Sequence, residues 1–411
     1  MITPSFALTA TERVLPRLAL DFTTASLDPR VTFTRSGATA TFTGANGLIQ
    51  SAAINAPRFD YNPTTLACRG LLIEESRTNL ALNSAVITAG SGTTVSPDAA
   101  VSPDGTLSAD LIIETVITGE HYAGDRAIAV TAGSTYTWSV FVKDGPSANR
   151  SLYLRVAVAA NITLVFDPRT KTISNPGGLG YLSSEFQELP NGWFRVAMAF
   201  TAQTTATLVC RLQLFTTTSV YTGDGTSGLY LWGAQLEAGS FPSSYIPTAG
   251  SQVTRSADIA TMTGTNFSNW YNASEGTFVA WASIPSNYPS GFQTFFESSD
   301  GTTANVISNV SNAGADVINI EMTTAGSLVA GFYPSYASGS TKLAFAYKLN
   351  NTNYGKDGVA GTTDTTSAVP TISQVNFGAN QIPSNFLNGH VQKFFYYPQR
   401  LTNAELAAFS K

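Results

Sequence analysis

The sequence predicts an all-β protein with two antiparallel β-sandwiches of the jelly-roll type in tandem, preceded by a strand-rich N-terminal module. Three observations indicate this fold class. Apolar and polar residues alternate with a period of two in many short segments, as half-buried strands require. Glycine and proline, which supply 34 and 19 of the 411 residues, separate these segments. A capped helical pattern stands out at 402–410, so we expect less than ~10% helix.

Residues 1–82 are expected to form the N-terminal module. The stretch VTFTRSGATATFT (31–43) alternates apolar and polar residues, which is typical of a half-buried strand. Asn46-Gly47 is a signal for a tight hairpin turn. The segment GLLIEESRTNL (70–80) closes the module.

Residues 83–248 are predicted to form the first sandwich. STYTWSVFVKDG (134–145) is a clear alternating strand that ends at Asp144-Gly145. Strands then recur with turns between them and no convincing helix, which is the pattern of a sandwich. They are expected at 151–158, 162–170, 192–202, 208–215 and 228–236. Gly239, Pro242, Pro247 and Gly250 then mark a connector.

Residues 249–411 are predicted to form the second sandwich, with the junction near residues 245–265. EGTFVAWASIP (275–285) suits a long strand, and residues 341–361 suit two strands around an Asn-rich turn. A final strand over 390–397 precedes the helical run. Thr402 or Asn403 is expected to cap this helix, with Glu405 in its first turn.

Several phrases carry a family resemblance. LDPRVTFTRSGAT, PRFDYNP and GLLIEESRTNL resemble a leader that recurs in phage and prophage structural proteins. GSTYTWSVFVK, NGWFRVAMAF and LWGAQLE followed by SYIPT resemble the carbohydrate-binding-module-like jelly rolls of many phage virion proteins. The stretch around YGKDGV and the closing strand and helix resemble the laminin-G and concanavalin-A-like lectin fold.

The resemblance implies a virion protein of the tail-fibre, head-fibre, spike or capsid-decoration type, assembled in the host cytoplasm. Its N-terminal module would anchor it to other capsid or tail proteins, and its lectin-like sandwiches would adhere to host cell-surface polysaccharide without catalysis. A homotrimer is expected, because virion fibres and spikes are usually symmetric. Two other functions stay open: a polysaccharide-degrading virion enzyme, and a purely structural subunit without a ligand.

Composition supports the absence of several classes of partner. Charged residues make up 12% of the chain, about half the usual ~25%. The net charge is −5 and the basic residues are scattered, so no nucleic-acid partner is expected. No run approaches the ~18 apolar residues of a membrane span, and the N-terminus lacks a signal-peptide pattern. Cys68 and Cys210 match no metal spacing and are expected to be reduced and buried, with a single disulfide between them as the alternative.

The sequence indicates no catalytic residues. His121 and His390 are the two histidines; the first is expected in a solvated loop and the second as a structural residue on a strand. Glycoside hydrolysis needs two carboxyl groups facing one cleft. Glu74 and Glu75 are adjacent on a presumed strand, so their side chains should point to opposite faces. We therefore expect a protein that is not an enzyme.

Sugar binding is the chemistry that the residues favour. Sugars stack on aromatic rings and bind planar polar side chains, and alternation places a suitable set on the outward face of three strands. We expect this set to share one solvent-facing surface: Tyr153, Arg155, Trp193, Arg195, Arg211 and Gln213. The alternative is a solvated face whose arginines pair with acids. Tyr136 and Trp138 are expected in the core.

Loops of the second sandwich supply further candidates. Exposed tyrosine and asparagine suit adaptable recognition surfaces. The predicted binding residues are Tyr333, Tyr336, Asn353 and Tyr354, with Tyr288 in a similar loop. They are also ordinary turn residues.

Three aspartates lie in loops of the first sandwich. Asp98 and Asp104 each follow a proline, and Asp224 lies within TGDGT. Carboxylate oxygens in loops are ligands that calcium prefers. Aspartate also forms turns without any metal. Two roles therefore stay open for these aspartates: binding a structural calcium ion, or forming turns without a metal. No other cofactor is expected.

Overall fold

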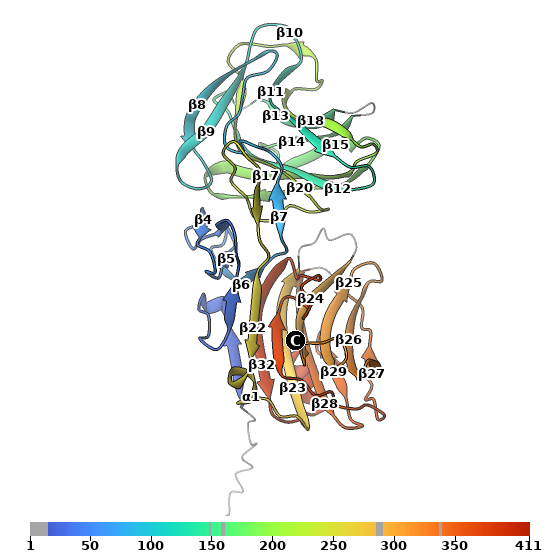
Figure 1. Cartoon of the computed structure of the whole chain (residues 1–411). Coiled ribbons are helices and arrows are strands. Elements are labelled where there is room, and N and C mark those ends of the chain that lie inside the picture. Colours follow the sequence, from blue (N-terminus) through green and yellow to red (C-terminus); the bar gives the residue numbers. More distant parts are fainter. Residues whose placement is uncertain (1–14, 148, 158–160, 285–290, 337–338) are drawn as a thin grey trace, which may run out of the picture.

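The computed structural model describes residues 15–147, 149–157, 161–284, 291–336 and 339–411. Figure 1 shows two β-sandwiches, one above the other, joined by a narrow waist. Every strand pair in the described residues is antiparallel, which confirms the predicted all-β fold. The helices are short: α1 (Thr265–Ser268), α2 (Asn403–Phe409), η1 (Phe22–Thr24) and η2 (Pro190–Gly192).

The upper sandwich contains two main sheets. The six-stranded sheet has the order β16 (Tyr181–Glu188), β17 (Trp193–Thr201), β12 (Thr135–Asp144), β20 (Gly228–Ala238), β9 (Leu107–Glu114) and β8 (Thr93–Val101). The five-stranded sheet has the order β11 (His121–Val130), β18 (Ala206–Phe215), β13 (Ser151–Ala157), β14 (Ile162–Asp167) and β15 (Thr172–Gly177). A small ladder pairs β10 (Thr118–Gly119) with β19 (Tyr221–Thr222).

Alternation explains the core of the upper sandwich. Every second residue of a strand faces the opposite sheet, so apolar residues at a period of two form one buried layer. Trp138 and Val140 of β12 meet Leu152 and Leu154 of β13 there, all buried. Tyr136 and Trp138 belong to this core, as predicted.

The lower sandwich also contains two sheets. The eight-stranded sheet runs β30 (Val359–Ala360), β29 (Asn353–Lys356), β28 (Gly339–Lys348), β23 (Glu275–Ile284), β32 (Gly389–Tyr397), β6 (Cys68–Ile73) and β5 (Phe59–Tyr61), with β1 (Leu18–Asp21) also on β32. The seven-stranded sheet runs β2 (Thr32–Thr34), β22 (Ile259–Thr263), β31 (Gln374–Phe377), β24 (Phe292–Ser299), β25 (Val306–Asn312), β26 (Val317–Thr324) and β27 (Ser327–Phe332). The Phe394 ring of β32 packs against the seven-stranded sheet. Its centroid lies 5.0 Å from that of Phe377 and 5.1 Å from that of Phe296.

The expected N-terminal module is not a separate unit in the described residues. β1 pairs with β32 in the register Leu18↔Tyr396, β6 also pairs with β32, and β2 pairs with β22. Leu18, Leu20 and Phe22 lie in the core of the lower sandwich. The physical reason is that these apolar strand residues need a partner face. The hairpin of β3 (Ala40–Thr43) and β4 (Ile49–Ala52) stays outside the two sheets.

The upper sandwich is inserted into the lower one. The chain leaves through β7 (Arg77–Asn79) and returns through β21 (Val253–Arg255), and these two strands pair with each other. Above them, the Gly250 amide donates to the Leu82 carbonyl at 2.7 Å, and Asn83 forms a bridge with Ala249. Residues 83–248 are thus a self-contained insertion, and the lower sandwich is built from both flanking segments.

A buried ion cluster holds the waist. It consists of Arg35, Arg58, Glu74, Arg255 and Asp258. The Arg58 guanidinium pairs with Glu74 at 2.7 Å and also with Asp258, while Arg35 reaches Asp258 at 3.0 Å. Charges removed from water are tolerated when each is paired and hydrogen-bonded. The cluster therefore ties the N-terminal segment to the returning chain.

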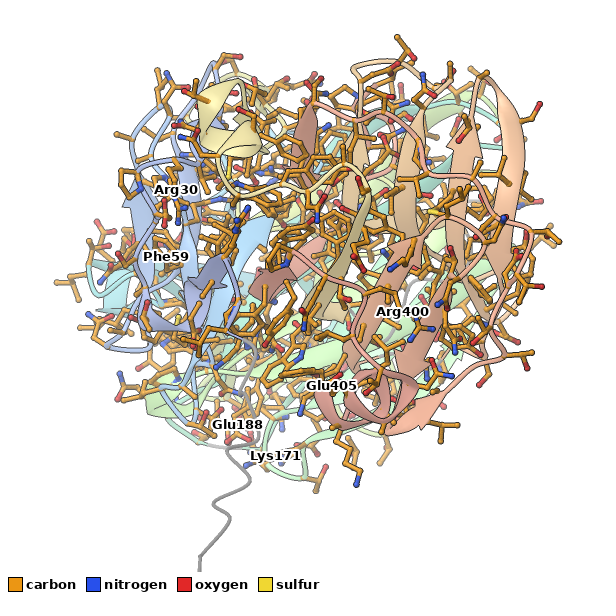
Figure 2. All side chains as sticks on the ribbon, turned by 90° about the horizontal axis from the view of Figure 1, so that it is seen from below. Arg30, Phe59, Lys171, Glu188, Arg400 and Glu405 are labelled. Atoms are coloured by element: carbon orange, nitrogen blue, oxygen red, sulfur yellow. The ribbon has the colours of Figure 1, made fainter. Side chains whose placement is uncertain are left out.

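The C-terminal helix α2 confirms the predicted capped run. The Thr402 hydroxyl accepts from the Glu405 amide, and the Glu405 carboxylate accepts from the Thr402 amide at 2.7 Å. Arg400 and Glu405 lie at this end of the helix (Figure 2). Leu406 packs against Val279 and Ala344 on the outer face of the eight-stranded sheet.

No helix in the described part of the chain has the length and hydropathy needed to cross a lipid bilayer. The two cysteines are unpaired thiols: Cys210 is buried in β18, whereas Cys68 in β6 is half-buried. The expectation that both are buried thus holds for Cys210 only.

Candidate functional site: a polar cleft at the waist

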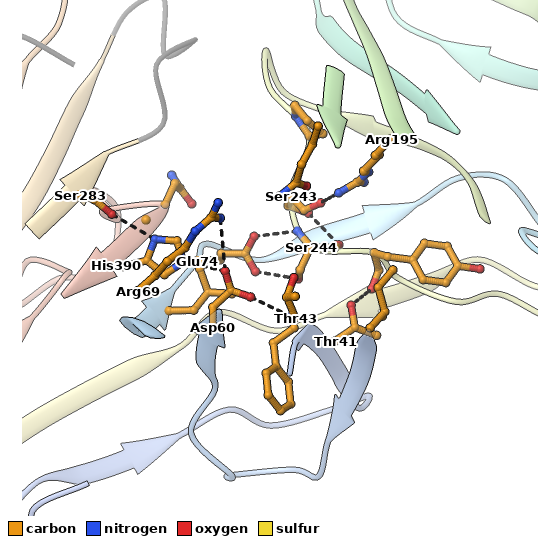
Figure 3. A pocket seen from close by; sticks show the side chains of 18 of the residues that line it. Thr41, Thr43, Asp60, Arg69, Glu74, Arg195, Ser243, Ser244, Ser283 and His390 are labelled. Atoms are coloured by element: carbon orange, nitrogen blue, oxygen red, sulfur yellow. Dashed lines mark hydrogen bonds and ion pairs between the residues drawn. The ribbon is translucent and has the colours of Figure 1, made fainter. Parts of the chain in front are cut away.

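A cleft of about 540 Å³ opens between the two sandwiches. Three parts of the chain line it: the N-terminal segment around β3, β5 and β6, the outer side of β16 and β17, and the end of β23 together with the start of β32. The connector around Ser243 and Ser244 closes one side (Figure 3). Ligand sites typically have this size and lie at such junctions.

One wall carries a row of hydrogen-bonded side chains from three strands. The Ser283 hydroxyl lies 3.1 Å from Nδ1 of His390, and Nε2 of His390 lies 2.9 Å from Oδ2 of Asp60 (Figure 3). The Arg69 guanidinium lies 3.6 Å from the same carboxylate oxygen. The hydrogen-bonded row thus joins β23, β32 and β5, with Arg69 of β6 beside it.

The sheet positions this row. Ser283 and His390 are register partners on neighbouring antiparallel strands, so their side chains stand side by side on one face. His390 is also the register partner of Leu72 on β6. Asp60 is held from its other side, because its Oδ1 accepts the Thr43 amide at 2.7 Å.

The opposite wall is formed by the connector and β17. The Glu74 carboxylate accepts the amide and the hydroxyl of Ser244, both at 2.7 Å. Burial alone would raise the pKa of Glu74, but the Arg255 and Arg58 guanidiniums and the Ser244 hydrogen bonds outweigh it and hold this pKa well below its usual range. Arg195 donates to the Ser243 carbonyl at 2.6 Å. Glu74 therefore stays ionised, as part of the ion cluster.

The six outward residues predicted for the upper sandwich do not share one surface. Trp193 and Arg195 lie in the six-stranded sheet, whereas Tyr153, Arg155, Arg211 and Gln213 lie in the five-stranded sheet. The outward faces of two packed sheets lie on opposite sides of a sandwich. The prediction of one common groove is therefore wrong, although Arg195 does line the cleft.

Trp193 is not solvent-facing. It points away from the main core, as alternation requires, but only 1% of its surface is exposed. A second core with Leu189, Trp232 and Tyr245 covers it, and its Nε1 donates to the Val101 carbonyl at 3.0 Å. The predicted stacking platform is therefore a packing residue.

The polar face of the five-stranded sheet is a network of ion pairs. Arg155 pairs with Glu120 at 2.7 Å, and Arg211 pairs with Glu120 at 3.0 Å and Asp125 at 2.8 Å. On this sheet the arginines therefore pair with nearby acids, which was the alternative to a sugar-binding groove.

The two uncharged members of this set are packed. Tyr153 lies against Phe215, with ring centroids 5.4 Å apart. Gln213 is 1% exposed and donates to the Ser219 carbonyl, so its predicted exposure is wrong. A role in binding stays a prediction for Tyr153, Arg155 and Arg211.

The candidates of the second sandwich divide in the same way. Tyr333 is 51% exposed and its hydroxyl lies 3.1 Å from Glu321. Tyr336 and Tyr354 pack against the core, and Tyr354 lies 5.3 Å from the Phe332 ring. Asn353 is fully buried, and its amide donates to the Gly361 carbonyl, so it holds a turn. Tyr288 lies outside the described residues.

The three predicted calcium ligands each hold a local structure. Asp104 accepts from Ser102 and Thr106, and Asp224 accepts from Thr226 and Ser227. The Asp98 amide donates to Asp110. Within the described part of the chain, no three His, Cys, Asp or Glu residues come together as a metal site. Asp104 and Asp224 thus hold turns, whereas Asp98 lies within β8 and takes part through its backbone amide, so its expected place in a loop is wrong.

One of the two histidines, His121, does not lie where the sequence predicted it. His121 is not in a solvated loop: it begins β11, is fully buried, and lies between the carbonyls of Gly92 and Tyr221. His390 does lie on a strand beside Gly389, as predicted, but it faces the cleft. The sequence could predict that His390 lies on a strand. It could not predict its contact with Asp60, because Asp60 lies 330 residues away.

Comparisons with known proteins show weak fold similarities. No family model and no curated protein matches the sequence. The carbohydrate-binding module CBM40 of a Ruminococcus gnavus sialidase, solved with α2,3-sialyllactose, has a TM-score of 0.30 at 18% identity, over 34% of this chain and 84% of that one. A tandem of CBM22 modules from Paenibacillus barcinonensis Xyn10C has a TM-score of 0.26 at 9% identity, over 79% and 98%. Domains LG4-5 of the mouse laminin α1 chain have a TM-score of 0.22 at 10% identity, over 81% and 91%.

Proposed function

We propose that this chain is a glycan-binding virion subunit and that the cleft at the waist holds a saccharide unit of the host surface polysaccharide. The observation that carries the proposal is the cleft itself, with its volume of about 540 Å³ and its polar walls. Side-chain amides such as those of Gln187 and Gln392 line it, with the Phe42 ring among them. Planar polar groups beside a ring suit a sugar, which offers hydroxyls on its rim and C–H groups on its face.

Adhesion through this cleft does not require cleavage of glycosidic bonds. Glycoside hydrolysis needs one carboxyl group that stays protonated as the general acid. Glu74 is held ionised by Arg58 and Arg255, and Asp60 is engaged by His390, Arg69 and the Thr43 amide. These contacts favour a wall that orients a ligand over one that breaks the glycan chain.

The virion role rests on the phage-like sequence phrases and on the weakly charged surface. In such a particle the N-terminal region would contact capsid or tail proteins, and the subunit would assemble as a homotrimer. Light scattering of the purified protein measures its oligomeric state, and a monodisperse monomer at micromolar concentration would contradict the expected trimer. The open alternative is a structural subunit without a ligand.

A glycan-binding titration tests the proposed site. The wild type should bind a purified host polysaccharide or its oligosaccharides, and Gln187→Ala combined with Gln392→Ala should weaken binding by roughly two- to tenfold for each lost hydrogen bond. Gln203→Ala is the matched control, because Gln203 is exposed and bonds to the Thr201 carbonyl elsewhere. Equal affinity of the double variant and the wild type would reject the cleft as the site.

A further inference from the structure

Ser283, His390 and Asp60 combine the three groups of a nucleophilic relay in one open cleft. A serine hydroxyl lies within 3.1 Å of one imidazole nitrogen, and a carboxylate lies within 2.9 Å of the other. Such a set is recognised by geometry and role, whatever the chain order or fold. All three residues line the same cleft, so a ligand can reach them.

The carboxylate fixes the imidazole tautomer. Asp60 accepts the Thr43 amide through Oδ1, which leaves Oδ2 for Nε2–H of His390. With its proton on Nε2, the ring presents the lone pair of Nδ1 to the Ser283 hydroxyl. A histidine oriented in this way can act as a general base toward a serine.

We propose that Ser283, His390 and Asp60 hydrolyse small acyl esters carried by the saccharide in this cleft. The inference rests on the proposed function for its ligand class, an O-acylated sugar, and adds to it a reaction that leaves the glycosidic chain intact. His390 is the base, Ser283 is the nucleophile, and Asp60 is a positioning residue.

The reaction balances with water as the second substrate. The Ser283 oxygen attacks the ester carbonyl carbon while its proton passes to Nδ1 of His390. The C–O bond to the sugar then breaks, and the same proton goes to the departing sugar oxygen, which leaves an acyl-serine. Water attacks that acyl group, gives its proton to Nδ1, and releases the carboxylic acid as Ser283 takes the proton back.

The wall that carries Ser283 suits an acyl group and a developing negative charge. Leu72, the register partner of His390, adds an apolar side chain to this wall. The Arg69 guanidinium, 3.6 Å from Asp60, also lines the cleft, and it carries N–H donors of the kind that stabilise a developing negative charge.

Two assays with the full chain test the proposal. The wild type should release p-nitrophenol from p-nitrophenyl acetate, and a fluorophosphonate probe should label Ser283, located by mass spectrometry of the peptide. Ser283→Ala should lose the label and about 100-fold or more of the hydrolysis rate. Ser340→Ala is the control: this exposed serine is the register partner of Ser283 on β28 and should keep both signals. Absence of labelling and hydrolysis in a folded wild type, or full activity of Ser283→Ala, would overturn the proposal.

Asp60→Asn separates positioning from folding. The amide keeps the size of the side chain and can still accept the Thr43 amide, but it no longer favours the required tautomer. We expect kcat to fall at least tenfold while KM and the melting temperature change little. If Asp60→Asn loses the probe label and also melts at a clearly lower temperature, Asp60 acts only in folding, which contradicts the assigned role.

The same variants distinguish this proposal from the proposed function. Ser283→Ala removes a nucleophile from one wall, so glycan binding by this variant should persist. A wild type that cleaves p-nitrophenyl acetate but binds no glycan refutes the proposed function alone. A wild type that binds glycan but neither cleaves esters nor reacts with the probe refutes the hydrolytic proposal alone.

Discussion

Trp193 shows at the scale of one residue how a surface position becomes a core position. Its ring is packed among Leu189, Trp232 and Tyr245 with 1% exposure. We expect Trp193→Ala to lower the free energy of unfolding by roughly 3–5 kcal/mol, the usual cost of truncating a buried aromatic. Urea denaturation measures the change. Tyr333→Ala, at a 51% exposed site, should stay within about 0.5 kcal/mol, and an equal cost for both would contradict this assignment.

Glu297 on β24 is a second residue with a measurable consequence. It is 7% exposed, and burial raises its pKa to about 7 despite the hydrogen bond from the Gln381 amide. A folded-state pKa above the unfolded value favours the protonated carboxyl, so the native state loses stability as pH rises from about 4.5 through 7. Glu297→Gln should therefore stabilise the protein at pH 8.5, by up to about 3 kcal/mol, and have little effect near pH 4.

Urea denaturation of the wild type and of Glu297→Gln at pH 4 and pH 8.5 measures this difference in the free energy of unfolding. Glu188→Gln, a change at a half-buried carboxyl paired with Lys171, is the comparison. A stabilisation by Glu297→Gln that is the same at pH 4 and pH 8.5 would show that charge burial is not its cause.

Helix α2 is the element whose stability depends most plainly on its cap. The reciprocal bonds of Thr402 and Glu405 satisfy amides that the first turn leaves without partners. Thr402→Ala should cost about 1 kcal/mol, and Thr402→Asp should restore most of it because aspartate is a good N-cap. Thermal unfolding followed by circular dichroism measures both. If alanine and aspartate behave alike, the cap does not hold the helix.

At the scale of the whole molecule, the inserted arrangement predicts which fragments fold. Residues 249–411 alone lack β1, β2, β5 and β6, so they should not form a stable sandwich. A chain in which Leu82 is joined to Gly250 by a short linker should fold, because these residues already share a 2.7 Å hydrogen bond. Size-exclusion chromatography and thermal unfolding compare the two. Cooperative melting of 249–411 alone would contradict the arrangement.

The sequence predicts local features of this fold well and distant contacts poorly. Period-two alternation correctly turns Trp193 away from the main core, because parity is a property of one strand. What covers that face, including Tyr245, comes from another part of the chain. The pairing of Leu18 with Tyr396 and of Asp60 with His390 has no local signature either. The waist cleft depends on such contacts, so the sequence alone could not assemble it.

The pairing of β1 with β32 sets an order of events during synthesis. At roughly 5–20 residues per second, β1 leaves the ribosome on the order of 20–80 s before its partner exists. The upper sandwich contains all its own strands and can fold in that interval. Its folding brings Leu82 and Gly250 together, which removes a long loop from the closure that the lower sandwich must still make. The inserted domain thus prepares the assembly of the domain that surrounds it.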